Sequence, residues 1–309
     1  MAWTGPTHRV RLATAVATIL LFTLSLCFFG CSSGDTTSGA SFSTKSSVDT
    51  VNFNDSAAEG ANEAFVDTSQ VSNGVVGVKA TNDSRIKLQI ASGQYSETFD
   101  IPGDGTATWC PLTFGDGSYT FNVMQNTSGN NYVELYSATA NVALTSEFAP
   151  YLLPNVFCDY NEGSQCVARA RELVADASNE AEVVEAICNW VVQNISYDDE
   201  KAANLKTSSG YIPDPDETLS TGTGICFDYA SLGAAMLRSQ GIPTKIVTGY
   251  VSPGDIYHSW IMVYIDGTWK SAQFSVTSNT WSRVDLTFAA SGDNENVGDG
   301  KSYTDRYVY

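Results

Sequence analysis

Between about residues 70 and 145, apolar and polar positions alternate in short runs, and turn-forming residues separate each run from the next. Alternation with a period of two puts every second side chain on one face of a strand, as in a half-buried sheet. The predicted strands are 75–78, 86–90, 95–99, 119–123 and 132–136. Short strands at regular intervals with Gly, Asn and Asp between them predict a small β-sandwich domain, which we place at residues 61–150.

After residue 150 the alternation gives way to helical spacing. Two amphipathic helices are predicted over 166–177 and 180–194, because apolar side chains recur at i, i+3, i+4 and i+7 from Val184 onward. A change from strand spacing to helix spacing indicates a change of domain. We therefore place a second domain at residues 151–309.

The first thirty residues have the pattern of an export signal. Arg9 and Arg11 precede an apolar stretch over residues 12–29, and a Ser- and Gly-rich segment follows it. A basic start, an apolar stretch and a polar break are typical of a secretory signal peptide. The stretch is just long enough to span a bilayer, so a retained membrane anchor is the alternative. We expect a signal peptide over residues 1–30.

A cysteine directly follows this segment. Gly30-Cys31-Ser32 resembles the lipobox of bacterial lipoproteins, in which the cysteine is lipidated and becomes the first residue. The resemblance implies a lipid anchor at Cys31, whose two acyl chains would meet the requirement for stable attachment. Residues 31–60 are rich in Ser, Thr and Gly, which predicts a flexible tether. We expect an extracytoplasmic protein that touches the bacterial cell membrane through this lipid alone.

The composition excludes several classes of function. The 309 residues include 16 Lys and Arg and 34 Asp and Glu, which give a net charge of −18. Such a field repels phosphate backbones, so no nucleic-acid partner is expected. The chain has two histidines, His8 in the signal segment and His258. This excludes a polyhistidine metal centre, and neither a metal nor another cofactor is expected.

Cys226 lies where a reactive thiol is expected. It follows the glycine-containing loop 222–224 and begins a predicted helix whose apolar stripe includes Ala230 and Leu237. Free N–H groups and the dipole at a helix N-terminus favour the thiolate, which is the nucleophilic form of cysteine. The same N–H groups can stabilise a developing oxyanion. A buried structural cysteine at a tight turn is the alternative.

His258 begins a predicted strand that follows the Cys226 helix and a strand-like run over residues 245–251. Imidazole titrates near neutral pH and can take the proton of a thiol. Because His258 is the one histidine beyond the signal segment, any imidazole chemistry of the mature protein depends on it. Cys226 and His258 are therefore a candidate nucleophile and base.

Motifs around these two residues occur in the order of a known family: Gly224-x-Cys226-x-x-x-Ala230, Arg238-x-x-Gly241-Ile242-Pro243, His258-x-Trp260 and Trp281-x-x-x-Asp285. They resemble the transglutaminase-like superfamily of papain-related folds, over roughly residues 160–309. The resemblance implies an α+β core in which the cysteine helix packs on an antiparallel sheet, here preceded by the β-sandwich. It also implies a Cys–His–Asp triad, with Cys226 as nucleophile, His258 as base and acid, and an aspartate that orients the imidazole.

Two residues compete for the third position of this triad. Asp285 fits the family's Trp-x-x-x-Asp pattern on a predicted strand over 281–288, and a carboxylate stabilises imidazolium well. If residues 266–267 form a two-residue hairpin, Gln273 becomes a diagonal neighbour of His258 and could orient the ring through its amide. We favour Asp285.

Tyrosines and cysteines elsewhere add secondary candidates. Tyr197 and Tyr211 precede the nucleophile in the stretch where the family often places an aromatic oxyanion donor, and Tyr197 is the candidate that we retain. Cys158 and Cys166 flank a short polar loop and could close a disulfide outside the cytoplasm.

Two functions are compatible with these features. The first is a surface-anchored, cysteine-dependent amide hydrolase or acyltransferase that forms a thioester. The resemblance implies protease, amidase or cross-linking activity on a protein or peptide substrate, cell-wall peptides included. The second is a catalytically inactive scaffold whose β-sandwich binds a ligand at the cell surface. The intact Cys, His and Asp set favours the enzyme, because a scaffold has no physical need of it.

Overall fold

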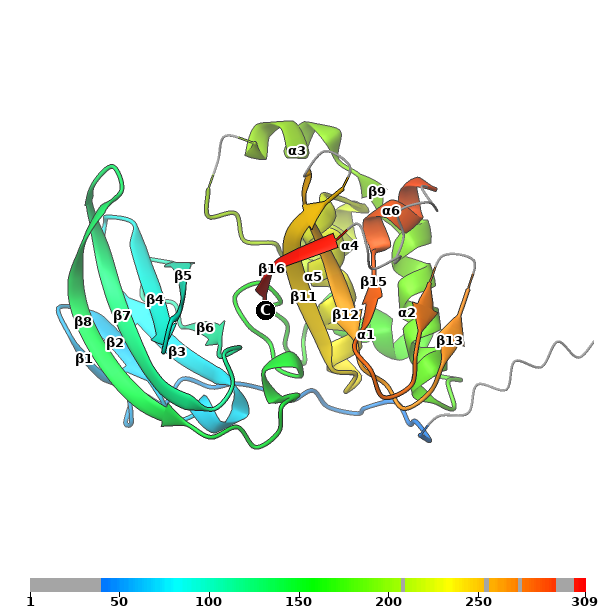
Figure 1. The fold of residues 1–309 in the computed structure, drawn as a ribbon, viewed down its shortest axis with the longest axis horizontal. Helices are drawn as coiled ribbons and strands as arrows, with labels where there is room; N and C mark the ends of the chain where they lie inside the picture. Colours follow the sequence, from blue (N-terminus) through cyan, green and yellow to red (C-terminus); the bar gives the residue numbers. More distant parts are fainter. Residues whose placement is uncertain (1–39, 207–208, 253–255, 272–273, 293–302) are drawn as a thin grey trace, which may run out of the picture. The chain divides into compact units, whose positions relative to one another are not determined.

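The N-terminal half forms two four-stranded antiparallel sheets, so the predicted β-sandwich is confirmed (Figure 1). The computed structural model describes residues 40–206, 209–252, 256–271, 274–292 and 303–309. One sheet has the order β1-β2-β3-β6 and the other the order β5-β4-β7-β8. The strand bounds are β1 Glu59–Ala61, β2 Ala64–Asp67, β3 Val75–Ala80, β4 Ile86–Ser92, β5 Tyr95–Ile101, β6 Thr108–Pro111, β7 Gly117–Ser128 and β8 Asn131–Val142.

The alternating sequence pattern corresponds to the buried face of these strands. In β4, Ile86, Leu88 and Ile90 are buried, and the residues between them are not. Phe99 of β5 and Phe121 of β7 are also buried. Burial of one such side chain stabilises the fold by roughly 1.5–3 kcal/mol, so a slip of one residue in register would be costly.

Helices dominate the chain after residue 150, interspersed with strands. Their bounds are α1 Gln165–Leu173, α2 Glu180–Asn194, α3 Asp199–Leu205, α4 Pro215–Thr221, α5 Cys226–Ser239 and α6 Leu286–Ser291. The α2 helix has its predicted bounds. Its N-cap residue, Asn179, accepts the N–H of Glu182 at 3.0 Å through its side chain. Such a cap supports a helix start by about 1 kcal/mol.

A third antiparallel sheet, with the order β15-β12-β11-β16, packs against α5 (Figure 1). Its strands are β11 Thr244–Val251, β12 Ile256–Val263, β15 Ser282–Val284 and β16 Tyr303–Val308; short pairs form between β9 Ser196–Tyr197 and β10 Thr223–Gly224 and between β13 Trp269–Lys270 and β14 Ser275–Val276. Every residue of α5 from Asp228 to Ser239 is buried. A Cβ at Gly233 would lie 2.6 Å from the Leu286 side chain, so glycine lets α5 and α6 approach closely. The predicted α+β fold class is confirmed.

Arg238, near the end of α5, is a buried cation that holds three parts of the chain together. Its guanidinium donates to the carbonyls of Leu153, Thr244 and Tyr309 at 2.9, 2.8 and 2.8 Å. A buried guanidinium is tolerated when its donors find acceptors of this kind. The linker after the sandwich, strand β11 and the C-terminal strand are therefore fixed to the same helix.

Residues 40–49, here called the N-terminal strap, correct the expectation of a flexible tether over 31–60. The backbone N–H of Phe42 donates to the carbonyl of Ser178 at 2.9 Å, and Val48 is buried. A segment rich in Ser and Thr is thus held in place where single apolar side chains and backbone hydrogen bonds anchor it.

The predicted signal peptide over 1–30 and the predicted lipidation site Cys31 lie outside the described residues. Within the described part of the chain, no helix combines the length and the apolar character that crossing a bilayer requires.

Glu97 of β5 gives the fold a pH dependence that can be measured. Its side chain is buried beside Tyr309, and burial raises its pKa from 4.5 to about 7 despite a hydrogen bond with Tyr309 that lowers it. Between these two pH values the folded state binds more protons than the unfolded state, so the free energy of unfolding falls as pH rises. Above about pH 7 the stabilisation that comes from the protonated Glu97 is lost.

We expect Glu97→Gln to remove this loss, which amounts to on the order of 2–3 kcal/mol between pH 4.5 and pH 7.5. Urea unfolding of the wild type and the variant at both pH values measures it. Glu200→Gln, an exposed position on α3, is the matched control and should follow the wild type. Parallel pH profiles for the wild type and Glu97→Gln would contradict the assignment.

Candidate active site

A buried carboxylate fixes the N-terminus of α5, where Cys226 is the first residue. Asp228 accepts the N–H of Ile225 at 2.8 Å, pairs with the ammonium of Lys201 at 2.8 Å and accepts the hydroxyl of Tyr211. A Cβ at Gly224 would lie 2.6 Å from the Asp228 side chain, so glycine is needed for the carboxylate to fold back. The turn that presents the cysteine is therefore held from three sides.

Cys226 differs from the other described cysteines in its exposure. It is half-buried and lines a cavity of about 600 Å³, together with His258 and Tyr197. The remaining described cysteines are buried, and burial raises the pKa of each: Cys110, Cys158, Cys166 and Cys188. A thiol of raised pKa without access to solvent is inert, so Cys226 is the candidate nucleophile of the described chain.

His258 projects from β12 between the cysteine and a carboxylate. Its Nε2 lies 2.8 Å from Oδ2 of Asp285, and its ring stacks on Phe288 with centroids 4.5 Å apart. Burial lowers the pKa of His258, but hydrogen bonds and charge interactions with Asp285 and Cys226 raise it more, to about 10. Because Nε2 faces Asp285, Nδ1 is the ring nitrogen left for Cys226. The imidazole can thus carry a proton between the thiol and a substrate.

Asp285 is fully buried and is bonded through both oxygens. Its Oδ1 accepts the N–H groups of Thr287 and Phe288 at 3.1 and 3.0 Å, as the N-cap of α6. Its Oδ2 accepts the Tyr303 hydroxyl at 2.8 Å and also faces His258. The carboxylate therefore has a fixed orientation, which in turn fixes the imidazole plane.

The structure brings Cys226, His258 and Asp285 together, as the sequence predicts. It differs in the element that carries Asp285: the strand expected over 281–288 ends at Val284, and a helix begins at Leu286. The reason is the capping role of the Asp285 side chain, which starts the helix. Gln273, the alternative partner of the imidazole, lies outside the described residues.

Tyr197 lies beside the nucleophile because β9 and β10 pair in parallel. Their register sets Tyr197 opposite Gly224, two residues before Cys226. Burial and the neighbouring charges, first that of Cys226, raise the pKa of Tyr197 to about 12, so its hydroxyl keeps its proton near neutral pH. Tyr211 instead donates to Asp228. Of the two tyrosines, Tyr197 is the one that lines the cavity.

The predicted disulfide between Cys158 and Cys166 is wrong in this structure, because both thiols are free. The Cys158 sulfur faces the carbonyl of Ser231 on α5 at 3.8 Å, whereas Cys166 lies in the first turn of α1, where its N–H donates to Asp216. Both cysteines are buried in the same hydrophobic cluster, but their sulfurs are not bonded to each other. Their spacing around a short loop was not sufficient to predict a bond.

Asp228, Phe288 and Tyr303 support the site and were not predicted from the sequence. Asp228 carries a signal that could have been recognised, since an acidic residue three positions after the N-cap is the second half of a capping box. Phe288 and Tyr303 carry no such local signal. Among the described residues, no group of three or more His, Cys, Asp or Glu side chains could hold a metal ion.

Relatives of this chain are found by sequence over part of its length. The UPF0252 protein of Methanocaldococcus jannaschii is 29% identical over 154 residues, which cover 45% of this chain and 40% of that protein. The kyphoscoliosis peptidase of Mus musculus is 30% identical over 120 residues, which cover 36% of this chain and 17% of that protein. The match therefore spans less than half of each relative.

Solved structures of similar fold include a protein of Cytophaga hutchinsonii that has been proposed to be a cysteine protease. It is 14% identical, with a TM-score of 0.41, and the match covers 76% of this chain and 79% of that protein. Residues 167–285 of the present chain match the family model of the transglutaminase-like superfamily. This segment, which is similar to that superfamily, contains Cys226, His258 and Asp285.

Proposed function

We propose that this protein is a cysteine-dependent amide hydrolase or acyltransferase that works through a thioester on Cys226. The observation that carries the proposal is a half-exposed thiol in a cavity, bonded to an imidazole that a buried carboxylate orients. This chemistry is recognised by a nucleophile within hydrogen-bond reach of a base, which is in turn held by an orienting group. Members of the transglutaminase-like superfamily are often cysteine peptidases or acyltransferases.

In the resting site the proton of Cys226 would reside on His258, as an imidazolium–thiolate pair. The thiolate attacks the amide carbonyl, and the C–N bond breaks as the imidazolium protonates the leaving amine. A thioester then joins the acyl group to Cys226. Water or a second amine attacks the thioester while His258 takes the proton of the attacking group, and the thiolate is regenerated. The N–H of Cys226 at the start of α5 is the first candidate to stabilise the oxyanion, and the Tyr197 hydroxyl is the second.

The walls of the cavity favour an uncharged acyl donor. Its described lining contains no Asp, Glu, Lys or Arg, although the whole chain carries a net charge of −18. Exposed apolar side chains at Tyr197, Ile256 and Tyr257 border it. A carboxamide such as that of glutamine, or a backbone amide beside an apolar residue, is a suitable substrate group.

Covalent capture tests the proposal. We expect incubation of the full chain with glutamine-containing peptides or cell-wall fragments to add an acyl mass that hydroxylamine removes and that Cys226→Ala abolishes. Intact mass spectrometry measures the adduct. If neither the wild type nor Cys226→Ala formed an adduct with any of these substrates, an inactive scaffold would be favoured. Surface attachment through a lipid on Cys31 is a separate proposal, tested by the mass of the mature N-terminal peptide.

A further inference from the structure

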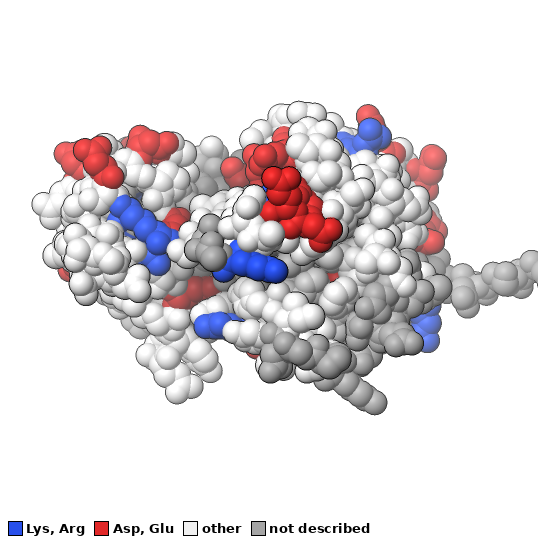
Figure 2. Space-filling view, turned by 90° about the horizontal axis from the view of Figure 1, so that it is seen from above, with Lys and Arg blue, Asp and Glu red and all other residues white. Residues whose placement is uncertain are grey.

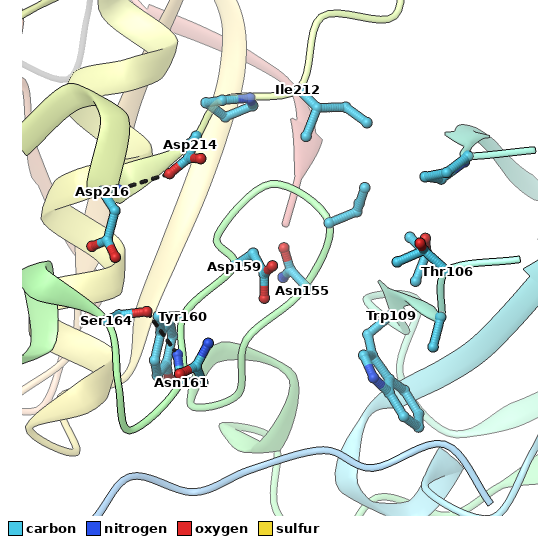
Figure 3. Close-up of a pocket in the computed structure, with 15 residues that line it drawn as sticks. Thr106, Trp109, Asn155, Asp159, Tyr160, Asn161, Ser164, Ile212, Asp214 and Asp216 are labelled. Carbon is cyan, nitrogen blue, oxygen red and sulfur yellow. Dashed lines mark hydrogen bonds between the residues drawn. The ribbon is translucent and has the colours of Figure 1, made fainter. Parts of the chain in front are cut away.

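A second cavity, of about 490 Å³, lies between β6 of the sandwich and the loop that leads into α1 (Figure 3). None of its lining residues belongs to the cavity of Cys226. Trp109, Tyr160 and Ile212 supply apolar wall, and the described residues that line the cavity include no lysine or arginine. The backbone N–H of Val156 donates to the carbonyl of Trp109 at 2.7 Å, so this loop is attached to β6. The volume suits a small organic group.

Three carboxylates line this cavity, and two of them are already engaged. Asp216 accepts the N–H groups of Gln165 and Cys166 at 3.0 and 2.8 Å, at the start of α1. Asp214 accepts those of Asp216 and Glu217 at 2.8 and 3.1 Å, at the start of α4. Helix N-termini offset the negative charge of such groups.

Asp159 is the carboxylate that remains available to a ligand. The residue is exposed to solvent, and partial desolvation of its carboxylate, followed by the charges of Asp214 and Asp216, raises its pKa, while a hydrogen bond with the backbone of Tyr160 lowers it. None of the described lining residues is a cation that could balance this charge. The described acidic residues are not grouped as metal ligands, so an organic cation is the better match. Acidic side chains also gather in patches on the face shown in Figure 2, which draws cations towards the protein.

Asn155 provides the second, independent observation. Its side chain is 2% exposed and its Oδ1 accepts the N–H of Phe157 at 3.0 Å, but its buried Nδ2 has no hydrogen-bond partner among the described residues. A buried donor without a partner is unfavourable and is satisfied by an acceptor on a ligand. Asn155 and Cys158 pair through two backbone hydrogen bonds, which brings Asn155 and Asp159 to the same end of the loop (Figure 3).

We propose that this cavity binds the free N-terminal residue of a peptide. The α-ammonium group of the peptide pairs with Asp159, and its first carbonyl accepts a hydrogen bond from Nδ2 of Asn155. The side chain of the N-terminal residue lies against Trp109 and Ile212. The ammonium and first carbonyl of a peptide sit on adjacent carbons. They match the carboxylate of Asp159 and the amide N–H of Asn155, which lie at the same end of the loop. A free amino acid fits less well, because its own carboxylate would face three aspartates. The assignment does not depend on catalysis by Cys226.

Calorimetry on the full chain carrying Cys226→Ala, which cannot turn over a bound peptide, tests this site. We expect leucine N-methylamide to bind in a saturable manner and its Nα-acetyl form to bind at least about tenfold more weakly, because acetylation removes the positive charge that pairs with Asp159. Affinity for the free amine should fall as pH rises through roughly 8, where the α-amino group loses its proton. Isoamylamine, which lacks the carbonyl, should also bind more weakly.

Asp159→Asn should reduce the affinity for leucine N-methylamide by about tenfold or more. Asp83→Asn, the same charge change at an exposed turn of the sandwich, is the matched control and should leave it unchanged. Equal binding of the free and acetylated ligands, or no saturable binding, would overturn the site even if Asp159→Asn failed to fold. Equal binding of isoamylamine and leucine N-methylamide would overturn the role of Asn155.

Discussion

Cys226→Ala is expected to reduce turnover to background, a loss of at least about 10⁴-fold, because no other described thiol is both exposed and bonded to an imidazole. The four buried cysteines cannot substitute, since burial raises the pKa of each thiol. Turnover of a substrate found by acyl capture measures the loss. Cys188→Ala, at a buried position on α2, is the matched control and should keep the activity of the folded fraction.

Alkylation of the same cysteine reports on the state of the thiol without any substrate. In the wild type, iodoacetamide should label Cys226 near neutral pH, because the protonated His258 stabilises the thiolate. In His258→Asn the labelling rate should fall at pH 7 and recover as pH rises through roughly 8.5, the pKa of an isolated thiol. Peptide mapping assigns the label. Equal rates in both proteins at pH 7 would remove His258 from the mechanism and favour a scaffold.

Asp285→Asn is expected to lower kcat by roughly 10³–10⁴-fold while leaving the fold intact. Asparagine is a good N-cap, so its side-chain oxygen can still accept the N–H groups that begin α6. The change removes the charge that faces Nε2 of His258 and leaves an amide that does not hold the imidazolium. Thermal unfolding checks the fold, and steady-state kinetics measure kcat.

The same variant should also change the pH profile. Hydrogen bonds with Asp285 and Cys226 raise the pKa of His258 to about 10, so the ion pair of imidazolium and thiolate persists well above neutral pH and is lost as pH rises through that value. Without the Asp285 charge, the alkaline limb of kcat/KM should move to lower pH by at least about one unit. Gln273→Ala is the comparison, since Gln273 was the competing partner. A larger loss in Gln273→Ala than in Asp285→Asn would reverse the assignment.

The candidate nucleophile and base could be identified from the sequence because each carries a local signal. Cys226 follows a glycine loop at a helix start, and His258 is the one histidine after His8 in the sequence. Helix α2 was predicted to the residue, because a helical repeat and the capping Asn179 agree. Where the local pattern and the tertiary environment impose the same conformation, sequence reasoning succeeds.

The remaining features depend on contacts between distant segments. Tyr303 reaches Asp285 because β16 joins the sheet beside β11, and no sequence period encodes that pairing. The N-terminal strap was expected to be flexible from its Ser and Thr content, but composition does not show that Phe42 and Val48 find packing partners. The bond expected between Cys158 and Cys166 failed for the same reason, since spacing along the chain does not describe the burial of each thiol.

The position of the N-terminal strap limits where this protein can be cut into separately folding parts. The strap pairs with residues near α2 before the chain enters the sandwich, and the chain then returns to form α1 and the helices that follow. The sandwich is therefore inserted between the N-terminal strap and the C-terminal domain on which the strap packs. A cut at residue 150 would separate the later helices from the strap. Gene fusions or truncations should therefore preserve residues 40–309 as one module.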